Sequence, residues 1–189
     1  MNSLIMDQDG NELWVFGYGS LMWDPGFPHL EAMPAVLSGF HRSFCIYSYQ
    51  YRGTRERPGL VLGLKPGGQC HGMAFRVVPE ETQATLAYLT DREMTSYVYN
   101  PMRLPVNLSV VVKDHIVHAH TYVADHTHPN YAADLTLEET ATLIRQGIGS
   151  RGPNRDYLEN TVQHLVDIGV DEPELVTLRD LVRRMESKS

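Results

Sequence analysis

A glycine-rich break in an apolar run is the first feature of the sequence that could do chemistry. Residues 14–23 read Trp-Val-Phe-Gly-Tyr-Gly-Ser-Leu-Met-Trp, a pattern typical of a buried strand that ends in a tight loop. Consecutive N–H groups in such a loop form a concave site for a carboxylate or phosphate, with no need for a basic side chain. The alternative is an ordinary turn with Tyr18 packed in the core. The candidate anion-binding residues are Gly17, Tyr18, Gly19, Ser20, Leu21 and Met22.

A basic stretch at residues 51–59 is a second candidate for anion binding. It contains Arg52, Arg55 and Arg57, followed by a Pro-Gly pair. Such a cluster in a loop is either solvated or directs a guanidinium fork at an anion in a cleft. The sequence leaves both interpretations open.

Several histidines gather between positions 115 and 128, and two of them have the i, i+2 spacing that places side chains on one face of a strand. That geometry can hold a transition metal, but no cysteine or carboxylate stands at ligand spacing within the strand. Exposed imidazoles, or imidazoles that cap the core, are therefore the favoured interpretation, and no metal is predicted. The histidines are His115, His118, His120, His126 and His128.

Composition limits the class of protein. The chain has 189 residues, of which 42% are hydrophobic, so we expect one domain spanning residues 1–189 with a substantial core. A formal net charge of −7 disfavours binding to nucleic acid or to an anionic membrane surface. No apolar run is long enough to span a membrane, and the N-terminus lacks the pattern of a signal peptide.

The two cysteines, Cys45 and Cys70, lie in predicted strands and form neither a Cys-x-x-Cys motif nor a zinc spacing. We expect both to be small core residues rather than nucleophiles. Two thiols in a chain of this size indicate a reducing compartment, so a cytoplasmic location is predicted.

The first two thirds of the chain show the period of two that is typical of strands. Short strands are expected at 35–37 and 40–47 after a long loop that starts at Asp24, and a hairpin at 60–64 and 70–78 around the turn 65–68. A further strand pair is expected at 106–113 and 116–123. Pro101 and Pro105 argue against a regular central strand over 97–104.

Helical signals are concentrated in the last third of the chain. A Pro-Glu-Glu start predicts a helix from Pro79 to about Glu93, and Thr136 with Glu139 forms a capping-box sequence. Further helices are expected at 137–146, 155–167 and 173–186. Five to seven strands followed by segregated helices predict an α+β fold, a mixed, barrel-like sheet with helices packed on one side.

Several separate segments together resemble the ChaC family of γ-glutamylcyclotransferases, whose members convert glutathione to 5-oxoproline and cysteinylglycine. The resemblance runs in order over residues 13–182. One departure follows Arg92-Glu93, where many family members have a glycine-tyrosine pair and this chain runs from Met94 to Tyr99. The matching segments are 16–23 with 25–27, Arg52-Gly53, Pro58-Gly59, Tyr88-Leu89, Arg92-Glu93, 122–125, His128-Pro129, Tyr131-Ala132 and 149–158.

The reaction of that family sets modest chemical requirements. The α-amine of the γ-glutamyl group attacks its own γ-carbonyl, and held intramolecular reactants reach effective molarities of about 10⁵–10⁸ M. The enzyme needs no cysteine or serine nucleophile, no metal and no organic cofactor, but it needs a base that moves a proton from the amine to the leaving nitrogen. The resemblance implies that Glu93 is this base. Apart from the resemblance, Glu93 is one of the 23 acidic residues of the chain. The alternative interpretation is a surface carboxylate at a helix end, paired with Arg92 or solvated.

The resemblance also suggests how a substrate is bound. The loop 17–22 would hold the α-carboxylate and polarise the γ-carbonyl, and the hydroxyl of Tyr157 would contact substrate unless Tyr157 is simply a buried helix residue. Arg52 is a weaker candidate for the carboxylate at the glycine end of glutathione. The expected partner is therefore a small molecule, glutathione.

Two other functions stay open at this point. One is a cyclotransferase for other γ-glutamyl amino acids or amines, because nothing in the sequence reads the cysteinylglycine half. The other is a non-catalytic module that binds anionic small molecules through the glycine-rich loop. A Rossmann-type nucleotide site is disfavoured, because Gly17-Tyr18-Gly19 lacks the third glycine and no helix opens after it.

Overall fold

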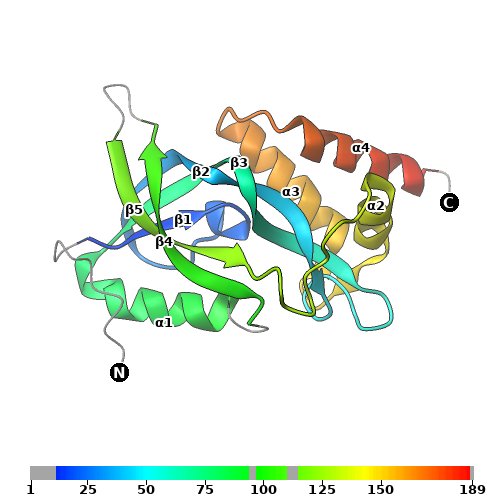
Figure 1. The fold of residues 1–189 in the computed structure, drawn as a ribbon, viewed down its shortest axis with the longest axis horizontal. Coiled ribbons are helices and arrows are strands. Elements are labelled where there is room, and N and C mark those ends of the chain that lie inside the picture. Colours follow the sequence, from blue (N-terminus) through cyan, green and yellow to red (C-terminus); the bar gives the residue numbers. More distant parts are fainter. Residues whose placement is uncertain (1–11, 94–96, 110–114, 188–189) are drawn as a thin grey trace. The chain divides into compact units, whose positions relative to one another are not determined.

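A computed structural model describes residues 12–93, 97–109 and 115–187. Its strands form a closed barrel in the order β1-β3-β2-β4-β5 (Figure 1). β1 pairs antiparallel with β3 and parallel with β5, so the sheet is mixed and β1 completes its closure. The strands are β1 (Trp14–Gly17), β2 (His29–Ser48), β3 (Gly59–Val77), β4 (Tyr99–Leu108) and β5 (His115–Ala124).

The residues group into two compact units, each made of two chain segments. The first comprises Met1–His41 with Pro66–Tyr122, and the second Arg42–Lys65 with Val123–Ser189. The long strands β2 and β3 pass through both. The prediction of a single domain stays a prediction.

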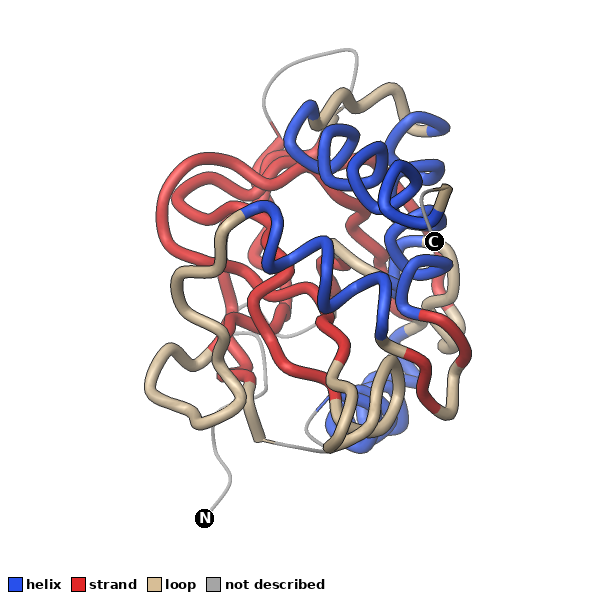
Figure 2. The backbone as a smooth tube through the Cα atoms, turned by 90° about the vertical axis from the view of Figure 1, so that its right-hand side faces the viewer, coloured by secondary structure: helices blue, strands red, loops and turns tan. Residues whose placement is uncertain are grey.

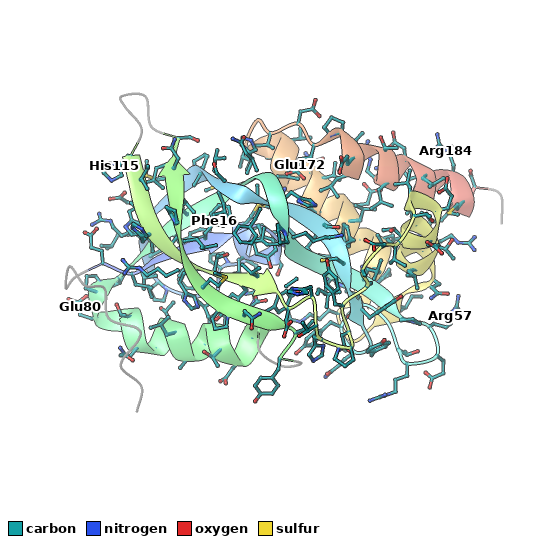
Figure 3. The ribbon with its side chains drawn as sticks, in the orientation of Figure 1. Phe16, Arg57, Glu80, His115, Glu172 and Arg184 are labelled. Carbon is teal, nitrogen blue, oxygen red and sulfur yellow. The ribbon has the colours of Figure 1, made fainter. Side chains whose placement is uncertain are left out.

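The first unit carries the short strand β1 and the helix that follows β3. A 3-10 turn, η2 (Pro79–Glu81), opens α1 (Thr82–Glu93), and Leu86 and Leu89 bury one face of that helix as predicted. Phe16 of β1 is 1% exposed and lies among the strands (Figure 3). β1 thus runs through the core and ends at the glycine-rich loop.

The second unit contains the helices that follow β5, which are among the blue elements of Figure 2. α2 (Leu137–Gln146), α3 (Asn154–Asp167) and α4 (Pro173–Glu186) contact one another, and the two-residue strands β6 (Ile148–Gly149) and β7 (Gly152–Pro153) pair between α2 and α3. The capping box of α2 is present: Thr136 Oγ accepts from the N–H of Glu139, and the Glu139 carboxylate accepts from the N–H of Thr136.

Two strand predictions were wrong for the same physical reason. The expected pair 35–37 and 40–47 is one strand, β2, and the expected hairpin around 65–68 is one strand, β3. Gly39 has φ +85°, and Gly67 and Gly68 have φ +98° and +72°, so glycines that suggested turns instead bend continuous strands. His41 Nδ1 donates to the carbonyl of Gly67 at 3.0 Å, which ties the two bends together.

Two further boundaries differ from expectation. The loop that begins at Asp24 is shorter than predicted, because β2 already starts at His29. Pro101 and Pro105 lie within β4, contrary to the prediction for 97–104. Their positions have the same parity, so both missing N–H groups face one edge of the strand, and the register with β2 covers Val106–Leu108, beyond the second proline.

Candidate active site

The predicted glycine loop, residues 17–22, is a tight turn at the end of β1. The 3-10 turn η1 (Ser20–Met22) is closed by hydrogen bonds from Met22 N to Gly19 O (2.9 Å) and from Asp24 N to Ser20 O (2.9 Å). The N–H groups of Ser20 and Leu21 precede the first of these bonds and so have no partner within the turn. They are the donors that such a turn offers to an anion.

Gly17 is required by close packing. A Cβ added there would lie 2.8 Å from the Cβ of Leu21 and 3.3 Å from the nitrogen of Met22, because the turn folds back over the end of β1. A real Cβ does not tolerate the shorter distance without a shift of its neighbours. The glycine loop therefore has its shape because residue 17 has no side chain.

The side chain of Tyr18 is part of the core, which was the alternative interpretation of this residue. Its ring is 9% exposed, and its hydroxyl donates to the backbone carbonyl of Tyr122 at 2.8 Å. The bond fixes the glycine loop to β5. Only the backbone of Tyr18 stays a candidate for contact with a ligand.

The end of α1 places a carboxylate next to the glycine loop. The guanidinium of Arg92 donates to Ser20 Oγ (2.9 Å) and to the carbonyl of Asp24 (2.7 Å), and its Nε lies 3.3 Å from Oε1 of Glu93. The side chain of Glu93 is 21% exposed. The side chain of Arg92 thus contacts both the predicted base and the predicted binding loop, and the pairing of Glu93 with Arg92 is the one that the alternative interpretation of Glu93 held.

Tyr122 of β5 lies close to the same carboxylate. Burial raises the pKa of its phenol above the ordinary range, the negative charge of Glu93 raises it further, and a hydrogen bond with the side chain of Thr90 opposes the shift. The hydroxyl of Thr90 also donates to the carbonyl of Leu86 at 2.8 Å. Tyr122 thereby links α1 to β5.

Sequence analysis assigned no role to Tyr88, Thr90 or Tyr122. Tyr88 accepts a hydrogen bond from Arg92 Nη1 at 2.7 Å, and its i, i+4 spacing from Arg92 was the signal that could have revealed it. No local spacing in the sequence predicts the contact of Thr90 with Tyr122, because that contact joins a helix to a strand that is distant in the sequence.

Arg52 and Tyr157 lie in the second unit, where they contact each other. The guanidinium carbon of Arg52 is 5.1 Å from the centroid of the Tyr157 ring, and Arg52 Nη1 donates to the carbonyl of Arg151 at 2.6 Å. Burial lowers the pKa of Arg52, and the charge of Arg151 adds to that effect. Tyr157 is 8% exposed and packs edge-on against Phe44, so it is buried as the alternative interpretation held.

The other arginines of the basic stretch are solvated. Arg55 and Arg57 are exposed, and the side chain of Arg57 extends away from the ribbon in Figure 3. Arg52 is thus the member of the cluster that the fold holds in place.

Burial affects His120 and both cysteines. Among the residues described, no group of three His, Cys, Asp or Glu side chains is placed to hold a metal ion. Burial lowers the pKa of His120. Cys45 and Cys70 are buried and free, and burial raises the pKa of the Cys45 thiol to about 12, so the prediction that they are core residues is confirmed.

The segment that follows Glu93 is described only from Tyr97 onward. The departure from the family pattern begins at residues 94–96, which lie outside the described residues, and Tyr97 beyond them is 74% exposed with φ +53°. Within the described parts of the chain, no helix is long and apolar enough to cross a membrane.

The sequence is similar to those of known enzymes from several organisms. A glutathione-specific γ-glutamylcyclotransferase of Escherichia coli is 34% identical over 94% of this chain and 75% of its own length. The protein of that name from Schizosaccharomyces pombe is 32% identical over 77% of this chain and 79% of its own. Human glutathione-specific γ-glutamylcyclotransferase 1 is 32% identical over 80% and 69%.

The fold has a close counterpart among solved structures. The crystal structure of a γ-glutamylcyclotransferase specific to glutathione from yeast superposes with a TM-score of 0.86 at 22% identity, covering 93% of this chain and 97% of that one. The predicted α+β class with a barrel-like mixed sheet is therefore confirmed. The model of the family described as "ChaC-like protein" matches residues 13–185, and the chain belongs to this family.

Proposed function

We propose that this protein is a glutathione-specific γ-glutamylcyclotransferase. The α-amine nitrogen of the γ-glutamyl group forms a bond to the γ-carbonyl carbon, and the bond from that carbon to the cysteine nitrogen breaks. The products are 5-oxoproline and cysteinylglycine. Relatives with this name at 32–34% identity over most of the chain support the proposal.

Glu93 acts as the base and then as the acid in this proposal. Its carboxylate takes one proton from the α-ammonium group so that the free amine can attack, and a second proton leaves the same nitrogen as the lactam forms; the leaving nitrogen receives both, so cysteinylglycine departs as an ammonium and no net proton is consumed. The observation that carries the proposal is the link from Glu93 through the Arg92 guanidinium to Ser20, which holds the carboxylate beside the glycine loop. A side chain that is 21% exposed is accessible to a small molecule yet partly withdrawn from water.

The glycine loop holds the substrate through its backbone. The N–H groups of Ser20 and Leu21 bind the α-carboxylate, and a neighbouring amide polarises the γ-carbonyl as negative charge develops on its oxygen. This mode of binding requires no basic side chain and suits a protein with a net charge of −7.

The remaining site assignments are proposals from the resemblance. Arg52 and Tyr157 are candidates for contact with substrate, and their cation–π contact orients both side chains within the second unit. The reaction proceeds without a cofactor, because nucleophile and electrophile belong to one molecule. The two free, buried thiols suit a reducing compartment and support a cytoplasmic location.

The direct test is release of 5-oxoproline from reduced glutathione by the wild type and by Glu93→Gln. We expect the amide variant to lose turnover by orders of magnitude and to retain binding of glutathione. Glu80→Gln is the matched control, because Glu80 is an exposed acid in η2, just before α1 (Figure 3). Full activity in Glu93→Gln would exclude Glu93 as the base, and absence of 5-oxoproline with the wild type would favour the binding module.

A second substrate tests specificity. γ-Glutamyl-alanine shares the γ-glutamyl group of glutathione but lacks the cysteinylglycine half. We expect a much lower kcat/KM with this dipeptide than with glutathione. Equal values would instead support a cyclotransferase for γ-glutamyl amino acids in general.

A further inference from the structure

The guanidinium of Arg92 makes more contacts than an ordinary surface ion pair with Glu93 would involve. It is 8% exposed, and it reaches Ser20 Oγ, the carbonyl of Asp24 and the hydroxyl of Tyr88 as well as Glu93. A buried cation is tolerated only when acceptors surround it. The planar fork of an arginine is suited to several acceptors in fixed directions.

The contact between Arg92 and Glu93 does not follow from helix geometry. Adjacent side chains on an α-helix point about 100° apart and do not face each other. The guanidinium reaches back to Oε1 of Glu93 because acceptors in the glycine loop and one turn earlier in α1 fix its direction. The hydroxyl of Tyr88 packs closely against Gly26, where an added Cβ would lie 2.1 Å from it.

The glycine loop and α1 are both anchored without Arg92. The loop has the hydrogen bonds of its own turn and the bond from Tyr18 to the Tyr122 carbonyl. The last turn of α1 is linked to Tyr122 through Thr90. Arg92 adds a further connection between the loop and α1, through Ser20 and Asp24, and it also contacts the Glu93 carboxylate.

We infer that Arg92 is a positioning residue for Glu93, which it holds in the orientation needed for proton transfer beside the glycine loop. The inference rests on the proposed role of Glu93 as the base. Arg92 does not move the proton itself, because a guanidinium has only donors and keeps its charge in proteins. The alternative is that Arg92 binds a carboxylate of the substrate directly.

Saturation kinetics separate these two roles. If Arg92 positions Glu93, Arg92→Met lowers kcat about 100-fold while KM changes less than about threefold, since misplacement of a catalytic group by about 1 Å has effects of that size. Arg92→Lys keeps the charge but loses the fork, so its kcat lies between those of the wild type and Arg92→Met. Arg76→Met is the matched control: Arg76 in β3 pairs with Glu12 and Glu31, away from the proposed site, so this variant should keep wild-type kcat.

Tyr88→Phe provides a milder test that does not depend on the folding of Arg92→Met. It removes one acceptor of Arg92, and we expect kcat to fall about three- to tenfold with KM unchanged. In the Arg92→Met background the same change has no further effect, because residues that act as a unit are not additive. Circular dichroism and thermal unfolding verify that each variant is folded.

The outcomes distinguish this inference from the proposed function. A KM raised tenfold or more with unchanged kcat in Arg92→Met would assign Arg92 to substrate binding. Wild-type kinetics in Arg92→Met, or additive effects of the two substitutions, would remove the positioning role. In both cases loss of turnover in Glu93→Gln would leave Glu93 as the base of a cyclotransferase. Full activity of Glu93→Gln would exclude Glu93 as the base and with it the positioning role, and only absence of 5-oxoproline with the wild type would overturn the cyclotransferase proposal.

Discussion

The hydroxyl of Tyr18 donates a hydrogen bond to the backbone carbonyl of Tyr122 across 104 positions of the sequence, at 2.8 Å. Both residues are buried, at 9% and 3% exposure. The bond joins the glycine loop to β5, and the side chain of Tyr122 in that strand lies near Glu93. One residue, Tyr122, therefore relates the proposed binding loop to the proposed base.

Removing this bond should destabilise the protein. Tyr18→Phe leaves the carbonyl of Tyr122 buried without this donor, and we expect the free energy of unfolding to fall by about 1–2 kcal/mol. Urea unfolding monitored by circular dichroism measures the change. Tyr49→Phe is the control, because the ring of Tyr49 is 38% exposed, and it should change the free energy by less than about 0.5 kcal/mol. Equal stability of Tyr18→Phe and the wild type would show that the bond contributes nothing net.

Asn154 at the start of α3 has a comparable structural role in the second unit. It is 0% exposed, its Oδ1 accepts from the N–H of Leu60 (2.6 Å), and its Nδ2 donates to the Leu60 carbonyl (2.7 Å). Asn154→Ala leaves both main-chain groups of Leu60 buried without these partners. We expect a loss of about 2–5 kcal/mol in the free energy of unfolding, measured by urea titration. The exposed Asn160 of the same helix provides the control, and a similar loss in Asn160→Ala would contradict this explanation.

Substitution of two glycines separates the effect of steric crowding from the effect of backbone conformation. Gly17→Ala should raise KM for glutathione at least tenfold, because its Cβ would push Leu21 and distort the glycine loop. At Gly39 there is open space but φ is +85°, so Gly39→Ala should leave KM unchanged and lower the free energy of unfolding by about 1–2 kcal/mol. Initial rates and urea unfolding of both variants measure the contrast. A wild-type KM in Gly17→Ala would mean that the exact shape of the loop does not matter for binding.

Helices were predictable from this sequence because their signals are local. The bounds 137–146 and 173–186 agree with α2 and α4, since the capping box at Thr136 and the proline at 173 act on their own first turns. Strand continuity was not predictable in the same way. Whether Gly39 bends a strand or ends it depends on pairing across the barrel, which no local window contains.

The candidate site was predictable in its parts and not in its assembly. The glycine loop could be identified from the residues alone, and Glu93 only through the resemblance to a family. The bond from Arg92 to Ser20 spans 72 positions, and spacing in the sequence gives no sign of it. The pairings of Tyr122 with Tyr18 and Thr90 likewise exist only once β1, β5 and α1 have come together.

The raised pKa of the buried Cys45 thiol should make the free energy of unfolding depend on pH in the alkaline range. Its pKa is raised from 9.0 to about 12, chiefly by burial, so between these values the folded protein keeps a proton that the unfolded chain has lost. The resulting contribution is fully present below pH 9 and declines as pH rises, by at most about 1.4 kcal/mol per pH unit. Cys45→Ala lacks this group. The difference in the free energy of unfolding between wild type and Cys45→Ala should therefore be constant from pH 7 to about 9 and shift against the wild type above it, as measured by urea unfolding up to pH 10.5. Parallel curves for the two proteins over the whole range would show that the thiol titrates alike in the folded and unfolded states.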